Sequence, residues 1–195
     1  MEALREQIGE ILRGWLIPIS ISLDQLGITP NQVSFAGAAL SLGSGWLITQ
    51  DRLIWAALVF LLGSSLDLLD GTLARATSQS TQTGAVLDST LDRVSEGVVF
   101  IAIGYLFAQR GQLLDMVLVF SAALTGFLVS YVRARAEAVG IQCTVGSVVR
   151  PERVLILSLG MLFDQLAIAI YVLLILSCVT LIQRLRFILN VSHQD

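Results

Sequence analysis

The sequence predicts an all-α integral membrane protein with six transmembrane helices and an N-terminal interfacial amphipathic helix. Of the 195 residues, 55% are hydrophobic and 14% are charged, which lies far from the balance of a soluble domain. Mean hydropathy is +0.79. Several apolar runs reach the roughly 20 helical residues that cross a hydrocarbon core of about 30 Å. A soluble protein made of these helices would lack the residues for a polar surface.

The first predicted element is the interfacial helix over residues 1–16. Its apolar residues Leu4, Ile8 and Ile11 recur at helical spacing, and charged residues take the other faces. This pattern is typical of a helix that lies in the membrane surface. The segment lacks the uninterrupted apolar stretch of a cleavable signal peptide.

Six membrane spans are predicted to follow, with short connections between them. Their residue ranges are 33–50, 53–74, 84–108, 112–132, 147–163 and 165–184. Because no linker, repeat or low-complexity segment interrupts them, we expect one domain over residues 1–195, with the six-helix bundle over 33–184.

The arginines predict how the chain is oriented, since none of the 12 basic residues is a lysine. With six spans, both termini lie on the same side of the membrane. The arginines on that side are Arg5, Arg13, Arg75, Arg133, Arg135, Arg150, Arg153, Arg184 and Arg186. The opposite loops hold Arg52 and Arg110, and Arg93 lies within a span. By the positive-inside rule, the arginine-rich side faces the cytoplasm of a multi-pass cell-membrane protein.

Four aspartates lie at bilayer depth near that cytoplasmic side. Asp67 and Asp70 are three residues apart in the second span, and Asp88 and Asp92 are four apart in the third, so each pair shares a helical face. Four carboxylates at this depth would cost on the order of 10 kcal/mol if nothing compensated them. Carboxylates that converge from two helices suit Mg²⁺ or Mn²⁺. The sequence has no Cys/His cluster of the kind that binds zinc.

Two other interpretations of the aspartates stay open from the residues alone. Acidic pairs on transmembrane helices also occur in ion-coupled transporters and proton relays. A structural ion-paired cluster of Asp67, Asp70 and Arg75 is a further alternative, although it leaves Asp88 and Asp92 unexplained.

The aspartates belong to a longer motif, D-x2-D-G-x2-A-R-x8-G-x3-D-x3-D. The motif is formed by Asp67, Asp70, Gly71, Ala74, Arg75, Gly84, Asp88 and Asp92. It resembles the signature of the CDP-alcohol phosphotransferases, with every fixed position filled. The resemblance implies transfer of a phosphatidyl group from CDP-diacylglycerol to an alcohol, with CMP leaving. It also implies six spans after an interfacial helix.

The resemblance further implies a role for each residue of the motif. Asp67, Asp70 and Asp88 would hold the metal, and the catalytic residue Asp92 would share in it or act as the base. Small residues and an arginine beside carboxylates suit a diphosphate. The implied contacts to the CDP-lipid are Asn31, Gly71, Ala74, Arg75, Thr81 and Gly84.

Arginines of the fourth and fifth spans predict the acceptor. Arg133, Arg135, Arg150 and Arg153 lie near the same membrane surface and suit an acceptor that carries a phosphate. Anchoring in anionic headgroups is the alternative for each. The surrounding segments resemble bacterial phosphatidylinositol-phosphate synthases, which implies inositol phosphate or another phosphorylated polyol. Glycerol 3-phosphate, the acceptor of phosphatidylglycerophosphate synthases, is the alternative.

The predicted partners are therefore the CDP-lipid, the phosphorylated acceptor and the lipid bilayer, with no nucleic acid. The resemblance also implies a homodimer. An ion-coupled transporter is the more distant alternative for the whole chain.

Overall fold

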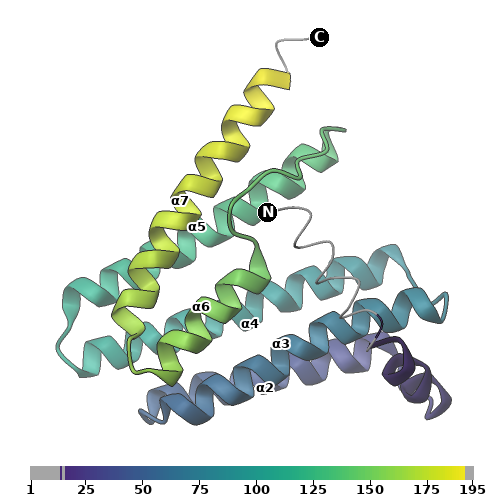
Figure 1. Cartoon of the computed structure of the whole chain (residues 1–195), viewed down its shortest axis with the longest axis horizontal. Coiled ribbons are helices and arrows are strands. Elements are labelled where there is room, and N and C mark those ends of the chain that lie inside the picture. Colours follow the sequence, from purple (N-terminus) through teal and green to yellow (C-terminus); the bar gives the residue numbers. More distant parts are fainter. Residues whose placement is uncertain (1–13, 15, 192–195) are drawn as a thin grey trace. The chain divides into compact units, whose positions relative to one another are not determined.

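A computed structural model describes residue 14 and residues 16–191 (Figure 1). These residues form helices and no strand, which confirms the all-α prediction. A helical segment over residues 16–25 is followed by α2 (Pro30–Thr49), α3 (Leu53–Ala76), α4 (Gln82–Gln109), α5 (Leu113–Ala138), α6 (Arg150–Leu162) and α7 (Leu166–Val191). Apart from residues 14 and 16, the predicted interfacial helix over 1–16 lies outside the described residues.

Three of these helices, α3, α5 and α7, are long and apolar enough to cross a membrane. These three helices indicate a membrane protein. The assignment of α2, α4 and α6 as spans stays a prediction. Helix α4 carries Asp88, Asp92, Arg93 and Glu96, which lowers its hydropathy.

Helix α6 is shorter than the span that the sequence predicts over 147–163. It has 13 residues, or about 20 Å at 1.5 Å per residue. Gly146 has a φ of +146°, outside the helical region. The helix begins only at Arg150, where Pro151 supplies the fixed φ of a first turn and Glu152 Oε2 accepts a hydrogen bond of 3.0 Å from Val149 N.

The helical segment 16–25 and helices α2 to α6 all end in the same kind of turn. The second residue after each helix has a left-handed backbone, with φ between +51° and +86°. These residues are Gly27, Asp51, Ser78, Gly111, Gly140 and Asp164. The next N–H donates to the carbonyl five residues earlier, as in the bond of 2.8 Å from Gln112 N to Phe107 O. Such turns satisfy carbonyls at a helix end and keep connections short.

The described chain divides into two compact units. The first comprises its residues up to Leu42 and Leu62–Glu96, and the second comprises Gly43–Leu61 and its residues from Gly97 onward. In the first unit, Val33 of α2 and Leu69 and Leu73 of α3 form a buried core, against which Leu16 and Leu23 pack. The 16–25 segment is thereby attached to α2 and α3.

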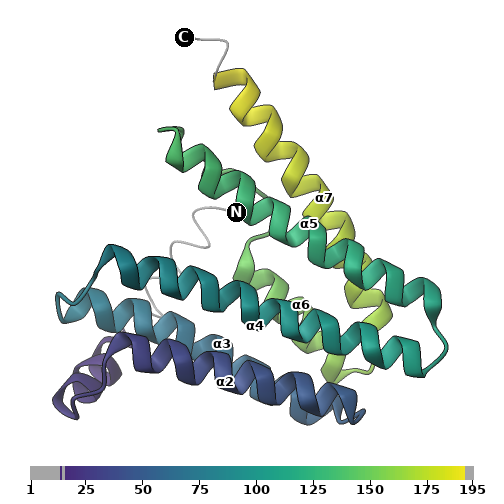
Figure 2. The same ribbon diagram turned by 180° about the vertical axis from the view of Figure 1, so that it is seen from behind.

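Glycines bring α2 and α3 very close together within the first unit, and both helices run side by side in Figures 1 and 2. A Cβ added to Gly37 would lie 2.9 Å from Gly63 O, and one added to Gly63 would lie 2.9 Å from Gly37 O. Small residues at such crossings let helix backbones approach closely. The crossing lies one turn from Asp67 along α3.

The second unit has the larger apolar core. Phe60, Phe100, Phe107, Met161 and Ile170 are among its buried residues. Helix α7 packs against α5 and α6. Within this unit Arg184 of α7 is also buried; its guanidinium donates to Val129 O of α5, and its Nε donates to Val145 O at 3.0 Å.

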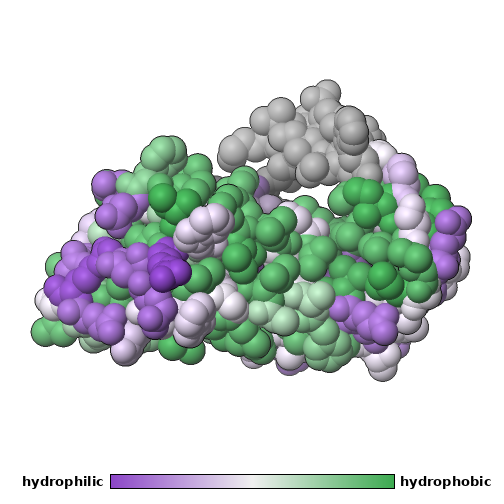
Figure 3. All heavy atoms as spheres, turned by 90° about the horizontal axis from the view of Figure 1, so that it is seen from below, coloured by the Kyte–Doolittle hydropathy of each residue, from purple (hydrophilic) through white to green (hydrophobic). Residues whose placement is uncertain are grey.

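The outer surfaces of the helices are largely apolar. Large side chains such as Trp46, Trp55, Leu124 and Ile175 are exposed. Figure 3 shows hydrophobic residues over much of the face that it presents. Large apolar side chains exposed in such number are expected of a surface that faces lipid.

Candidate active site

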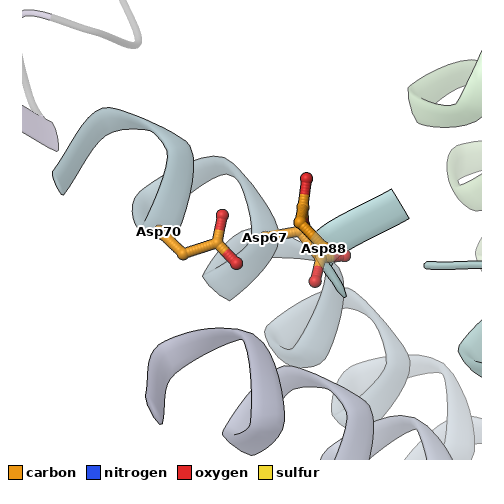
Figure 4. Close-up of side chains that lie close together, drawn as sticks. All are labelled: Asp67, Asp70 and Asp88. Atoms are coloured by element: carbon orange, nitrogen blue, oxygen red, sulfur yellow. The ribbon is translucent and has the colours of Figure 1, made fainter. Parts of the chain in front are cut away.

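Three of the four predicted aspartates converge within the first unit. Asp67 and Asp70 come from α3 and Asp88 from α4, and one carboxylate oxygen of each lies within 4.8 Å of the others (Figure 4). Asp70 is buried, and Asp67 and Asp88 are half-buried. We call these three residues the aspartate cluster. Hard oxygen ligands in this arrangement fit Mg²⁺ or Mn²⁺, as the sequence predicts.

The fourth aspartate, Asp92, lies one turn beyond Asp88 along α4 and is not part of the aspartate cluster. Its Oδ2 is 3.8 Å from Nη2 of Arg93, and Nη1 of Arg93 is 3.3 Å from Glu96 Oε2. Coordination of the metal by Asp92 and its action as the general base stay predictions.

A pocket of about 400 Å³ opens beside the aspartate cluster, within the same unit. Asp70 and Asp88 line it. All six residues that the family resemblance assigns to the CDP-lipid line it as well, namely Asn31, Gly71, Ala74, Arg75, Thr81 and Gly84. The structure therefore places residues from three helices and one turn around a single cavity.

Two glycines shape the wall of this pocket. A Cβ on Gly71 would lie 3.4 Å from Nη1 of Arg75, so the missing side chain leaves room for the guanidinium over the helix. A Cβ on Gly84 would lie 2.9 Å from Thr81 Oγ1. That oxygen caps α4 by accepting a hydrogen bond of 3.0 Å from Gly84 N. The positive end of the α4 dipole therefore lies at the pocket.

The start of α2 is built by a reciprocal cap that places Asn31 at the pocket. Thr29 N donates to Gln32 Oε1 at 2.9 Å, and Gln32 N is 3.4 Å from Thr29 Oγ1. Pro30 occupies the first helical position, where its missing N–H costs nothing. This T-P-N-Q pattern is a capping box, a signal that the sequence carries.

Sequence reasoning missed several polar residues at the pocket, among them Ser34 and Gln79. Ser34 of α2 donates a hydrogen bond to Asp70 Oδ2. Gln79, in the turn after α3, lines the pocket and donates to Asp24 Oδ1 at 2.9 Å, which attaches the turn to the 16–25 segment. A polar residue one turn after Asn31 on an apolar helix was the available signal for Ser34.

The four predicted acceptor-binding arginines differ in their surroundings within the second unit. Arg133 is exposed, donates to Glu137 Oε1 at 2.8 Å and lines a pocket of about 330 Å³ with Gly140. Arg135 is exposed, Arg150 is half-buried and Arg153 is buried, with 3% of its surface exposed. Arg133 is the one of the four that lines this pocket.

The chain is similar to known proteins in sequence and in structure. Residues 27–192 match the model of the CDP-alcohol phosphatidyltransferase family. The chain is 36% identical to archaetidylinositol phosphate synthase of Pyrococcus horikoshii, over 85% of this chain and 86% of that protein. It is also similar to two solved structures of Mycobacterium tuberculosis phosphatidylinositol phosphate synthase, each 30% identical. One has CDP-DAG bound, with a TM-score of 0.82 over 89% of this chain and 92% of that chain. The other is in complex with manganese and citrate, with a TM-score of 0.80 over 89% of this chain and 88% of that chain.

Proposed function

Because the chain belongs to the CDP-alcohol phosphatidyltransferase family, we propose that it transfers a phosphatidyl group from CDP-diacylglycerol to inositol phosphate and releases CMP. The observation that carries this proposal is the one pocket that the six predicted CDP-lipid residues share with Asp70 and Asp88. The similar synthases named above, one of them with CDP-DAG bound, support both the donor and the acceptor.

The proposed reaction is a displacement at phosphorus. The acceptor hydroxyl oxygen forms a new bond to the phosphorus that carries the diacylglycerol, and the bond from that phosphorus to the CMP oxygen breaks. The hydroxyl proton passes to a carboxylate, and Asp92 is our candidate because it lies one turn beyond Asp88 on the same helix. CMP leaves with the electron pair of the broken bond.

The aspartate cluster would hold a divalent cation, and Mg²⁺ is our proposal for the ion used in the cell. When bound, such a cation offsets the charge of the diphosphate and of the departing CMP. Arg75, the α4 amino terminus and the glycine-lined wall would orient the diphosphate, since a guanidinium and a positive helix end both favour phosphate oxygens. The remaining polar contacts, including Asn31, would select the cytidine.

The acceptor phosphate is proposed to bind the arginines Arg133, Arg135, Arg150 and Arg153. Arg133 lines a pocket and Arg153 is buried, so these two are the first to test. A phosphorylated polyol supplies the charge that such arginines bind best. Glycerol 3-phosphate shares that chemistry and is the alternative acceptor.

We also propose that the site faces the cytoplasm and that α2, α4 and α6 join α3, α5 and α7 in a six-helix membrane domain with an interfacial helix before it. The positive-inside distribution of arginines supports this orientation. A homodimer is the expected assembly, and crosslinking of the purified protein in detergent tests it.

The test of the proposed function is release of CMP by the purified full-length protein. CDP-diacylglycerol and its ether-linked counterpart are each supplied with inositol phosphate, with glycerol 3-phosphate or with no acceptor, in the presence of Mg²⁺ or Mn²⁺. We expect release with inositol phosphate, at a rate at least about 10 times that with glycerol 3-phosphate, which corresponds to 1.4 kcal/mol of discrimination. The opposite ratio identifies the glycerol phosphate reaction instead. If neither inositol phosphate nor glycerol 3-phosphate supports CMP release, the transferase proposal is wrong. Ion flux in sealed vesicles then becomes the next measurement.

A further inference from the structure

Helix α2 carries no carboxylate, yet one of its faces lies directly against the aspartate cluster. Asn31, Ser34 and Gly37 follow one another at intervals of three residues, which places them on one side of the helix. Asn31 and Ser34 line the pocket. Gly37 faces α3 at the close crossing with Gly63.

The first contact is between Ser34 and Asp70. Both residues are almost fully buried, with 4% and 3% of their surfaces exposed, and the Ser34 hydroxyl donates to Asp70 Oδ2. The same hydroxyl oxygen lies 3.2 Å from Pro30 O. Since the hydroxyl has one proton, the two acceptors compete, and the charged carboxylate is the stronger one.

The second contact is between Gly37 and Asp67. A Cβ on Gly37 would lie 3.1 Å from Asp67 Oδ1 as well as 2.9 Å from Gly63 O. The absence of a side chain at position 37 therefore provides the space in which the Asp67 carboxylate lies. Any larger residue must move either the carboxylate or the α3 backbone.

From these two contacts we infer that α2 positions the metal ligands, with Ser34 orienting the carboxylate of Asp70 and Gly37 leaving the space that Asp67 occupies. Ser34 and Gly37 are thus positioning residues, because they act through the aspartates. The inference rests on the proposed function in that the aspartate cluster is the metal site. Residues that orient metal ligands typically change metal affinity by about 10-fold to 100-fold when they are replaced.

The experiment measures Mn²⁺ binding to the purified full-length protein by calorimetry and by electron paramagnetic resonance of the free ion, without turnover. We expect Ser34→Ala to weaken Mn²⁺ binding by about 10-fold. Ser34→Thr retains a hydroxyl, so it should restore most of the affinity.

Ser44→Ala is the matched control. Ser44 lies on the same helix, is fully buried and donates to the backbone Ala56 O of α3 at 2.8 Å. This variant therefore loses an interhelical hydrogen bond that involves no aspartate. Both alanine variants should lower the melting temperature, whereas only Ser34→Ala should lower Mn²⁺ affinity. Equal Mn²⁺ affinity in the two would overturn the role of Ser34.

Gly37 is tested against Gly63 in the same way. Both alanine substitutions crowd the crossing of α2 and α3, but the Cβ at position 63 would contact Gly37 O, Leu40 and Ser41 rather than an aspartate. We expect Gly37→Ala to weaken Mn²⁺ binding further than Gly63→Ala does, and equal effects would overturn the role of Gly37. If the unsubstituted protein binds no Mn²⁺, the proposed metal site itself fails. If it binds Mn²⁺ and neither pair of variants differs, only the inference about α2 fails.

Discussion

Two regions of the molecule gather aspartates from different segments, and they do so in opposite ways. In the aspartate cluster, oxygens of Asp67, Asp70 and Asp88 approach one another within 4.8 Å. In the second region, Asp51 and Asp164 flank Arg110, whose Nη2 lies 2.6 Å and 3.7 Å from their Oδ1 atoms. We call this group the arginine bridge. It joins the turns after α2, α4 and α6.

The two regions differ in how the negative charge of their aspartates is compensated. The arginine bridge contains its own positive charge and is solvent-exposed, with 70% of the Asp164 side chain accessible. Such a surface ion pair contributes about 0–1 kcal/mol to stability. In the aspartate cluster, three carboxylates of like charge lie close together, and a bound cation would reduce their mutual repulsion. We therefore expect the arginine bridge to support the fold and the aspartate cluster to bind a cation.

The largest expected effect is that of Asp88→Asn. Loss of one ligand should reduce CMP release by about 1,000-fold, because a bound metal contributes several kcal/mol and each 1.36 kcal/mol is a factor of ten. Without metal, the melting temperature should stay the same or rise, since the substitution removes repulsion. Asp51→Asn, the same chemical change in the arginine bridge, should leave CMP release within about twofold, which is less than 0.5 kcal/mol. Comparable losses in both variants would remove the distinction between the regions.

Asp92→Asn separates the base from the metal ligands. We expect turnover to fall by about 100-fold or more, the lower limit for general base catalysis. Because Asp92 is not among the three clustered oxygens, Mn²⁺ affinity should change little. The measurement is a comparison of kcat with Mn²⁺ binding. A loss of Mn²⁺ affinity as large as that of Asp88→Asn would instead make Asp92 a ligand.

Gly84→Ala tests the pocket wall. The new Cβ would press on Thr81 Oγ1 and disturb the cap of α4, so we expect KM for the CDP-lipid to rise by about 10-fold, or 1.4 kcal/mol. Gly43→Ala is the control, because a Cβ there meets nothing within 4 Å. An alanine inside a helix normally stabilises it by about 1 kcal/mol relative to glycine. A rise in melting temperature without a change in KM at position 84 would contradict the role of the cap.

The smallest expected effect is that of Arg110→Gln. Removing the arginine bridge should lower stability by about 1 kcal/mol or less and leave CMP release unchanged. The loss should shrink at high salt, since exposed ion pairs are screened. Thermal unfolding in detergent at two salt concentrations measures it. A loss of activity as large as that of Asp88→Asn would mean that this region also serves the reaction.

Local sequence patterns predicted much of the site. The spacing of Asp67 and Asp70, together with a short polar turn before Asp88, was enough to bring carboxylates from two helices together. Asn31, Arg75 and Gly84 were assigned to one ligand through the family resemblance, and they do line one pocket. The helical segments were also predictable, because apolar runs and their polar connections are local features.

Other features depended on packing between distant segments. Ser34 reaches Asp70, which lies 36 positions further along the chain, and nothing local to either residue selects that partner. The left-handed Asp51 and Asp164 replace the usual glycine of a helix-ending turn, so composition did not indicate them. The sequence also did not indicate that Arg153 and Arg184 are buried, since arginines near a helix end normally reach the membrane surface.

By itself, therefore, the sequence determined the helices, the carboxylates and the chemistry that those carboxylates can support. The tertiary structure decided which oxygen atoms meet, which glycines leave room for them and which charges are buried. The physical reason is range: helical periodicity and capping act within a few residues, whereas Ser34 and Gly37 meet their aspartates only where α2 and α3 pack together.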